Sequence, residues 1–246
     1  MLIKSFAIQL YSIRDETESM GFPVVLQKLS DIGYSGVEFA GYGGLGEMEM
    51  RFLLQKTGLK PTGAHIGLER LETAFDEEIA YHKALGTKFI VVPAAPFDNA
   101  EEVKQTAARL NTLAKKVKNA GFRFAFHNHA IEFERDGSQY RIEDMMELAP
   151  EVDLQLDLFW ASRKDCDCAA FIQKHAPRVT SLHIKQMDDK GGGVDLGDGV
   201  LDFQKLIQTG LDNGIDTFIH EQEEFSGDPF ESLTNGVKHI MSLRKE

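Results

Sequence analysis

The chain is poor in residue types that define several classes of protein. Among its 246 residues there are only two cysteines, Cys166 and Cys168, with one residue between them. This spacing is too short for an ordinary disulfide, and it differs from the C-x-x-C spacing of redox and zinc motifs. We therefore expect two free thiols and a reducing, cytoplasmic compartment.

Long apolar runs and positive charge are also scarce. The longest apolar stretch, residues 89–97, is far too short to span a bilayer, and no basic region followed by a long apolar segment opens the chain. There are 27 Lys and Arg against 39 Asp and Glu, which gives a net charge of -12. This balance opposes binding to nucleic acid and to anionic lipid, because both require positive charge to neutralise phosphate. The sequence predicts no nucleic-acid partner and no membrane partner.

What the chain does contain is one unit, a strand followed by a helix, repeated along its length. The strand candidates are 6–10, 36–39, 62–65, 88–92, 123–127, 152–158, 180–185 and 217–221. Helical patterns separate them, clearest at 100–120, where apolar residues recur at three- and four-residue steps. This repeat predicts an α/β fold, a single (β/α)8 TIM barrel over residues 1–246. A doubly wound open sheet is the alternative, but it requires a glycine-rich loop that residues 9–12 do not provide.

Several strand candidates end in an ionisable residue whose neighbour two positions earlier is small or uncharged. The pairs are Gly36/Glu38, Gly63/His65, Ala125/His127, Gln155/Asp157, Ser181/His183 and Ile219/Glu221. Residues i and i+2 of a strand point to one side, so each pair shares a face, while large residues such as Phe124 and Phe126 point to the other. The sequence therefore predicts that bulk packs outward against helices and that ionisable groups point inward at one mouth.

Four of these residues close consecutive strands, the fifth to the eighth: His127, Asp157, His183 and Glu221. Active sites of such barrels form at the C-terminal strand ends, and neighbouring strands lie only about 4.8 Å apart. Two imidazoles and two carboxylates suit a divalent ion such as Mn2+, Zn2+ or Co2+. Taken singly, a strand-end carboxylate often caps the next helix, and a strand-end histidine is often structural. Capping does not require four consecutive strands to place metal-binding groups on the inward face, so we expect a metal site.

Seven segments carry a resemblance to a known family. They are QLYSIRDE at 9–16, GVEF at 36–39, FHNHAIEFE at 126–134, LQLDLFWA at 154–161, SLHIKQM at 181–187, LGDGVLDF at 196–203 and HEQEE at 220–224. The chain resembles the xylose-isomerase-like TIM-barrel superfamily and, more narrowly, its sugar phosphate isomerase/epimerase group, which is similar to AP endonuclease family 2. The resemblance implies a divalent ion (Mn2+, Zn2+, Co2+ or Mg2+) held by Glu, Asp, His and Glu from the last four strands. It also implies proton transfer through an enediolate. Asp157, His183 and Glu221 match three of the ligand positions.

The fourth ligand position departs from the family pattern. Where many relatives have Glu-Asn-His, this chain has His127-Asn128-His129. Either His127 replaces the carboxylate or Glu132 reaches back from the loop, and we favour His127 because it shares the inward face with Ala125. The change also removes one of the two carboxylates that flank the substrate in the proton relay of some epimerases.

Catalytic roles follow from the same strand ends. The predicted proton-transfer base is Glu221 or Glu132. Lys185, on the inward face beyond the seventh strand, is the candidate for stabilising negative charge on a substrate oxygen. Its alternative is a surface ion pair with Asp188 or Asp189.

A further group of residues is predicted to contact the substrate. Glu38 and His65 would line the far wall, opposite the metal set, and hydrogen bond to sugar hydroxyls, unless they are structural. Trp160 either stacks on a sugar ring or packs at the top of the sixth strand. Gln9 and His129 lie in two of the matching segments and complete the set.

Together these residues predict an enzyme, a metal-dependent isomerase or epimerase of a small-molecule carbohydrate or keto-sugar. The first alternative is a lyase, dehydratase or hydrolase of a 3-keto-sugar or keto-glycoside that uses the same site. An abasic-site endonuclease is a minor alternative, because it requires a basic groove and further His ligands. A non-catalytic sugar-binding barrel is the remaining one. A homo-oligomer is compatible with the sequence.

Overall fold

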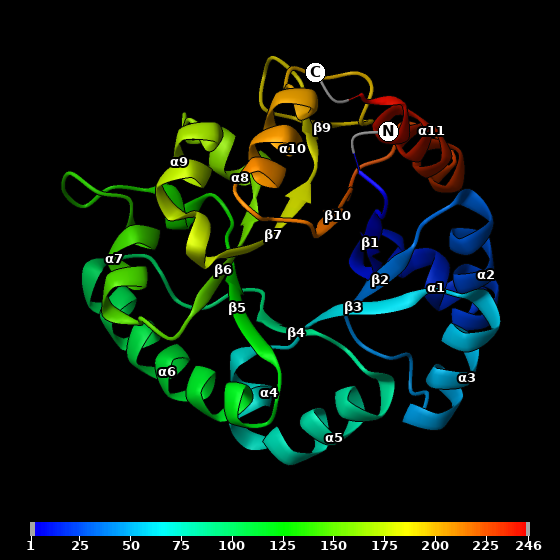
Figure 1. Cartoon of the computed structure of the whole chain (residues 1–246), viewed down its shortest axis with the longest axis horizontal. Coiled ribbons are helices and arrows are strands. Elements are labelled where there is room, and N and C mark those ends of the chain that lie inside the picture. The colour runs from blue at the N-terminus through cyan, green and yellow to red at the C-terminus, as the bar shows by residue number, and fades with distance from the viewer. Residues whose placement is uncertain (1–2, 245–246) are drawn as a thin grey trace.

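The computed structural model describes residues 3–244, in which parallel strands close into a barrel (Figure 1). Hydrogen-bonded neighbours follow the order β1, β10, β7, β6, β5, β4, β3, β2 around the barrel. These strands are β1 (Ala7–Gln9), β2 (Gly36–Phe39), β3 (Lys60–His65), β4 (Phe89–Val92), β5 (Arg123–His127), β6 (Asp153–Asp157), β7 (Val179–Ile184) and β10 (Phe218–His220). The predicted (β/α)8 TIM barrel is confirmed, and each strand overlaps the segment predicted for it.

Helices surround the strands and form the outer layer (Figure 1). They are α1 (Arg14–Met20), α2 (Phe22–Ile32), α3 (Glu47–Thr57), α4 (Leu68–Thr73), α5 (Phe75–Leu85), α6 (Ala100–Asn119), α7 (Arg141–Leu148), α8 (Leu158–Ser162), α9 (Cys168–His175), α10 (Phe203–Asp212) and α11 (Pro229–Ser242). Short 3-10 turns are η1 (Leu10–Ile13), η2 (Ile131–Phe133) and η3 (Ala176–Arg178), and a hairpin of β8 (Gln186–Met187) and β9 (Gly193–Val194) follows β7. Among residues 3–244, no helix is both long and apolar enough to cross a membrane.

Helix α6 shows how the sequence specifies the outer layer. The Asn99 side chain accepts hydrogen bonds from the backbone N–H groups of Glu101 and Glu102, which caps the helix. The predicted apolar stripe, from Val103 to Val117, is buried against the barrel. At the following turns, glycines end several helices, and Gly86 does so after α5 with a left-handed φ of 79°.

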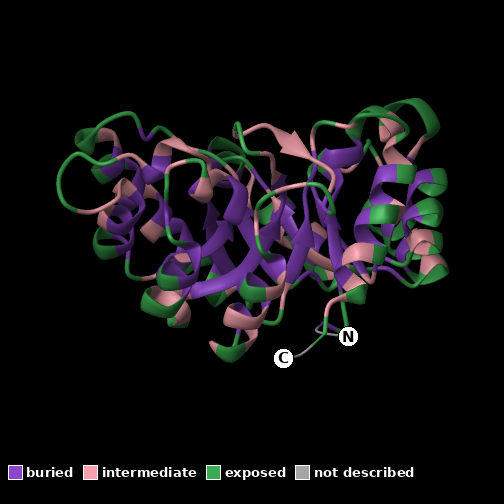
Figure 2. Cartoon of the chain, turned by 90° about the horizontal axis from the view of Figure 1, so that it is seen from above, coloured by how far each residue is buried: buried purple, intermediate pink, exposed green. Residues whose placement is uncertain are grey.

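The core is divided by the strands into an outer and an inner part. Phe124 and Phe126 belong to the large cluster that also contains helix residues, whereas Ala125 between them belongs to a small separate cluster with Phe89 and Val91. Figure 2 shows the buried strands enclosed by helices whose outer faces are exposed. The predicted alternation of outward bulk and inward small or polar groups therefore holds in β5, whereas β4 directs Phe89 and Val91 into the inner cluster.

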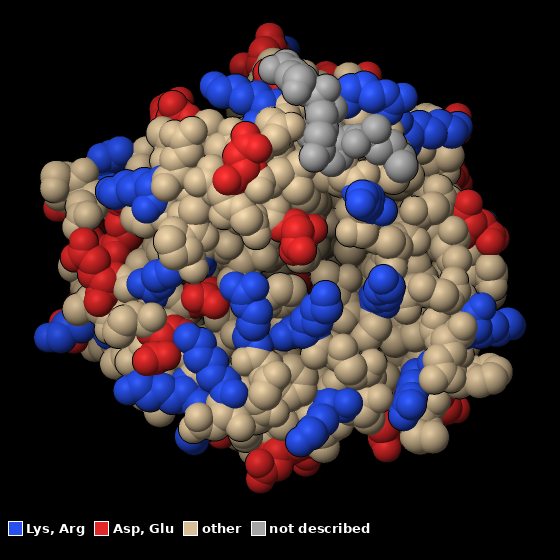
Figure 3. Space-filling model, viewed as in Figure 1, with Lys and Arg blue, Asp and Glu red and all other residues tan. Residues whose placement is uncertain are grey.

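Charge is separated along the barrel axis. Because the helices run antiparallel to the strands, their first turns surround the mouth and their last turns surround the strand starts. Within residues 3–244, the first turns of seven helices carry acidic residues, including Glu47, Glu77, Glu101 and Glu143, and the last turns of several of these helices carry basic residues, including Lys83. Lys and Arg side chains gather around the middle of the face where the strands begin (Figure 3). Each charge is favourable at its own helix end.

One buried histidine outside the barrel gives the fold a pH dependence. His82 of α5 has no exposed surface, and its ring bonds to the Tyr42 hydroxyl at 2.7 Å and the Thr87 hydroxyl at 2.9 Å. Burial lowers the pKa of His82 from 6.5 to about 4, against the opposing effect of Glu78. The fold therefore stabilises the neutral ring.

We expect this histidine to destabilise the protein in acid. Its contribution is complete above pH 6.5 and is lost as the pH falls toward 4, by about 3 kcal/mol in total. His82→Gln should be less stable at pH 7 but should lose less free energy of unfolding between pH 7 and 5. Urea unfolding of both proteins at several pH values measures this. Equal slopes of stability against pH would contradict it.

Candidate active site

The inward strand ends converge at the mouth of the barrel. His127 ends β5, Asp157 ends β6, His183 lies one residue before the end of β7, and Glu221 follows β10. One ligand atom from each of these four residues lies within 4.8 Å of the others, and all four residues are buried. We call them the four-residue set. A second group, His65 with His127 and His183, meets the same distance limit and shares two members with it.

Asp157 uses one of its carboxylate oxygens as a helix cap and leaves the other without a partner. Its Oδ1 accepts a hydrogen bond of 2.8 Å from the Trp160 N–H and caps α8. Its Oδ2 is buried and has no hydrogen-bond partner. Burial, reinforced by the charge of Glu221, raises the pKa of Asp157 to about 7. A buried carboxylate oxygen without a partner is costly unless a cation or proton accompanies it.

His183 lies between two carboxylates. Its Nδ1 is 2.7 Å from Glu221 Oε2, and its Nε2 is 2.8 Å from Glu38 Oε2. Burial alone would lower the pKa of His183, but Glu38 and Glu221 raise it to about 10. Without another cation, the ring therefore carries the positive charge that the two carboxylates require.

His127 has the opposite surroundings. Burial, together with the neighbouring histidines His183, His65 and His129, holds the pKa of His127 well below its ordinary value. Its Nδ1 is 3.2 Å from Gln155 Oε1. The ring is therefore neutral, which is the form of histidine that binds metal.

Glu132, the other candidate for the fourth ligand, lies outside the four-residue set. Its Oε2 accepts a hydrogen bond of 2.8 Å from the His129 N–H. Burial raises the pKa of Glu132 to about 7 despite its backbone hydrogen bonds. The carboxyl group is thus balanced between its two protonation states near neutral pH.

Glu38 and His65 do not form a separate wall opposite the set, as the sequence had suggested. Glu38 Oε2 contacts His183 Nε2 directly, and it also lies 3.1 Å from His65 Nε2. Gln9 Nε2 donates to the same oxygen at 2.8 Å. Burial alone would raise the pKa of Glu38, but His65 and His183 hold it well below its ordinary value. Their contact with substrate stays a prediction, and the carboxylate itself has no exposed surface.

Three further predicted residues lie around the mouth. Lys185 Nζ pairs with Glu223 Oε2 at 3.3 Å, not with the aspartates that follow β8. The same ammonium lies 4.4 Å from the ring centroid of Phe159 and 4.8 Å from that of Trp160. The rings of His129 and Trp160 lie 5.6 Å apart, so they form one side of the mouth.

Comparison with known proteins agrees with this architecture. The sequence profile of the xylose isomerase-like TIM barrel family matches residues 26–243. The chain belongs to this family. No curated protein is significantly similar to the chain in sequence.

Several solved structures share the fold over nearly the whole chain. A sugar phosphate isomerase/epimerase from Parabacteroides distasonis is 23% identical, with a TM-score of 0.84 over 97% of this chain and 98% of that one. A probable 3-DHS dehydratase from Bacillus anthracis is 14% identical, with a TM-score of 0.77 over 98% and 100%. An L-ribulose 3-epimerase is 15% identical, with a TM-score of 0.72 over 97% and 94%.

Two residues of the site in this xylose isomerase-like barrel, Gln155 and Asn128, were not predicted from the sequence. Gln155 was taken only as an uncharged neighbour of Asp157, yet it bonds to His65 at 2.7 Å and to Glu38 at 2.8 Å. Asn128 holds the backbone at the end of β6, because its Oδ1 accepts from the Asp157 N–H at 2.9 Å. The signal for Gln155 was its inward face, which placed an amide in the barrel interior.

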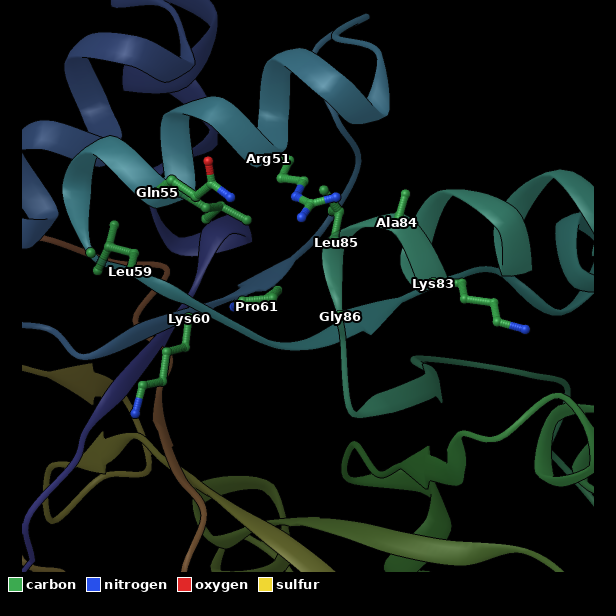
Figure 4. A pocket seen from close by; sticks show the side chains of 11 residues that line it. Arg51, Gln55, Leu59, Lys60, Pro61, Lys83, Ala84, Leu85 and Gly86 are labelled. Carbon is green, nitrogen blue, oxygen red and sulfur yellow. The ribbon is translucent and has the colours of Figure 1, made fainter.

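The barrel also has a groove far from this mouth. It has a volume of about 540 Å³ and lies where β3 and β4 begin, between the ends of α3 and α5. Arg51, Lys60 and Lys83 line it, but Figure 4 shows Lys60 and Lys83 pointing away from each other. Its polar groups do not converge, in contrast to those of the mouth.

Proposed function

We propose that the protein is a divalent-metal-dependent sugar isomerase or epimerase that moves a proton beside the carbonyl group of a carbohydrate or keto-sugar. The observation that carries this is the four-residue set with its unpartnered Asp157 Oδ2. Family membership and the names of two structural neighbours, a sugar phosphate isomerase/epimerase and an L-ribulose 3-epimerase, support it.

The donor atoms fit a divalent ion. His127, Asp157, His183 and Glu221 would hold it with two nitrogens and two oxygens, a mixture that suits Mn2+, Zn2+ or Co2+ better than Ca2+. The unpartnered oxygen of Asp157 and the two carboxylates around His183 both favour a cation at this place. When bound, the ion would polarise a carbonyl group and acidify the adjacent C–H bond.

The chain's own residues supply the remaining chemistry. Glu221 or Glu132 takes the proton, and the pKa of Glu132, raised by burial to about 7, suits exchange near neutral pH. The Lys185 ammonium lies between the Trp160 ring and Glu223, where it stabilises negative charge on a substrate oxygen. The His129 and Trp160 rings offer an apolar surface to the face of a sugar ring.

Elimination or hydrolysis of a 3-keto-sugar or keto-glycoside is the second candidate. It is favoured by one observation, that β5 ends in the neutral imidazole of His127 and not in a carboxylate. A relay between two carboxylates is then absent from these strand ends. Elimination needs only one base for the C–H proton.

Removal of metal tests the proposal. We expect chelation to stop the exchange of the proton beside the carbonyl for deuterium from D2O, followed by NMR with a panel of ketoses and 3-keto-glycosides. Co2+ or Mn2+ should restore exchange, whereas Ca2+, which prefers six to eight oxygens, should not. Full exchange by rigorously metal-free protein would refute the proposal. Release of an aglycone without isomerisation would select the second candidate.

A further inference from the structure

A layer of buried hydrogen bonds joins the histidines of the four-residue set to the barrel interior. Its centre is the pair formed by Glu38 of β2 and Gln155 of β6, which lie on opposite sides of the barrel in strand order. Neither side chain has exposed surface. Gln155 Nε2 donates to Glu38 Oε1 at 2.8 Å.

This bond fixes the orientation of the Gln155 amide. A carboxylate only accepts hydrogen bonds, so Gln155 must direct its NH2 group toward Glu38. The Ser181 hydroxyl, 3.2 Å from Nε2, accepts the second N–H. The Oε1 atom is then left as an acceptor that faces His65 Nε2 and His127 Nδ1, at 2.7 Å and 3.2 Å.

The two histidines of the set meet the Glu38–Gln155 pair at different ring nitrogens. His127 donates from Nδ1 to Gln155, which leaves its Nε2 without a proton. His183 donates from Nε2 to Glu38, and its Nδ1, 2.7 Å from Glu221 Oε2, faces the set and would lose its proton when an ion binds. The two rings are therefore held at different nitrogens, His127 at Nδ1 and His183 at Nε2.

We propose that Glu38 and Gln155 are positioning residues that hold His127 and His183 in these two complementary tautomers, so that both rings present a free nitrogen to a divalent ion. The inference rests on the proposed function for the identity of the ion. The contacts of His127 Nδ1 with Gln155 and of His183 Nε2 with Glu38 are independent of it. Partners of this kind orient the ligands of metal sites and raise their basicity.

The backbone makes room for the pair. At Gly63 of β3, a Cβ atom would lie 2.6 Å from Glu38 Oε1, closer than any side chain tolerates. The glycine that precedes His65 on its face therefore admits the carboxylate into the barrel. An alanine at this position would displace it.

Two variants separate the roles of the pair. Gln155→Leu removes the acceptor for His127 and leaves that for His183. Glu38→Gln removes the charge at His183, while its amide oxygen can still accept from the Gln155 NH2 group. We therefore expect Gln155→Leu to change the tautomer of His127 alone and Glu38→Gln to change the protonation of His183 alone.

Long-range 1H–15N spectra of the imidazole rings report these protons directly, for His127 in metal-free protein and for His183 in protein loaded with Zn2+, where Nδ1 should have lost its proton. Titration with Co2+ should show Kd raised about 10- to 100-fold in both variants. Ser181→Ala, which removes a contact of Gln155 but none of an imidazole, should keep the wild-type tautomers and Kd. If one variant does not fold, the other decides.

The outcomes are distinct. Wild-type protein with the proton on His127 Nε2, or unchanged tautomers in the variants, would overturn the inference while leaving the metal site intact. Wild-type protein that binds no Co2+ would refute the proposed function, and the ring spectra would still decide whether Glu38 and Gln155 hold the protons.

Discussion

Asp157→Asn is expected to remove divalent-ion binding and activity while leaving the fold intact. Asparagine keeps the oxygen that accepts from the Trp160 N–H, so the cap of α8 survives. It replaces the unpartnered Oδ2, however, with an uncharged NH2 group that repels a cation. We expect affinity for Co2+ to fall at least about 100-fold, beyond the loss typical of a partner that only orients a ligand. Calorimetric titration with Co2+ and the deuterium-exchange assay measure both effects.

The matched control is Asp167→Asn. Asp167 caps α9 by accepting from the Ala170 N–H at 3.0 Å, but it is exposed and outside the four-residue set. The Asp167→Asn protein should keep wild-type affinity for Co2+ and wild-type activity. The metal-free Asp157 variant should also be at least as stable as wild type at pH 8, because burial disfavours the charged form of this carboxyl group. An Asp157→Asn protein that retains Co2+ would contradict the assignment.

Glu221→Gln is expected to lower the rate of proton exchange by about 100- to 10,000-fold, the range for loss of a general base. In the wild-type protein His183 Nδ1 lies 2.7 Å from Glu221 Oε2. The glutamine oxygen can accept the same hydrogen bond, so the ring should stay in place. It can no longer take a proton, and it carries no charge toward an ion. Exchange into D2O at saturating Co2+ separates the loss of the base from weaker ion binding.

Two comparisons interpret this result. Glu224→Gln, in the same loop but exposed, should behave as wild type. Glu132→Gln tests the other base, because its carboxyl group is buried yet lies outside the four-residue set. A Glu132 variant that loses exchange while keeping Co2+, beside an active Glu221 variant, would assign the base to Glu132 and refute the first choice.

The two-residue period of strands made the inward-facing residues predictable from the sequence. That period placed His127, Asp157, His183 and Glu221 on the inward face, and the structure brings them together. It also placed Glu38 inward. This period could not show which side chains meet across the barrel. Strand order gives the neighbours of each strand around the barrel, but not the groups that meet at its centre.

Glu38 and Gln155 were misjudged for this reason. From β2, Glu38 seemed far from β7, yet its carboxylate reaches His183 at 2.8 Å because small inward residues such as Gly63 leave the centre open. An amide such as Gln155 gives no chemical signal in a sequence. Its importance follows only from the number of buried groups that must share it as a hydrogen-bond partner.

The separation of charge along the barrel axis has a consequence for what reaches the mouth. Acidic first turns such as those of α5 and α6 surround the entrance, while basic groups lie at the far end. At about 0.1 M salt such a field extends about 10 Å into solution, so it acts before any contact is made. We expect this field to attract divalent cations, to leave neutral sugars unaffected and to slow phosphorylated sugars. Added salt should reduce these differences in arrival rate.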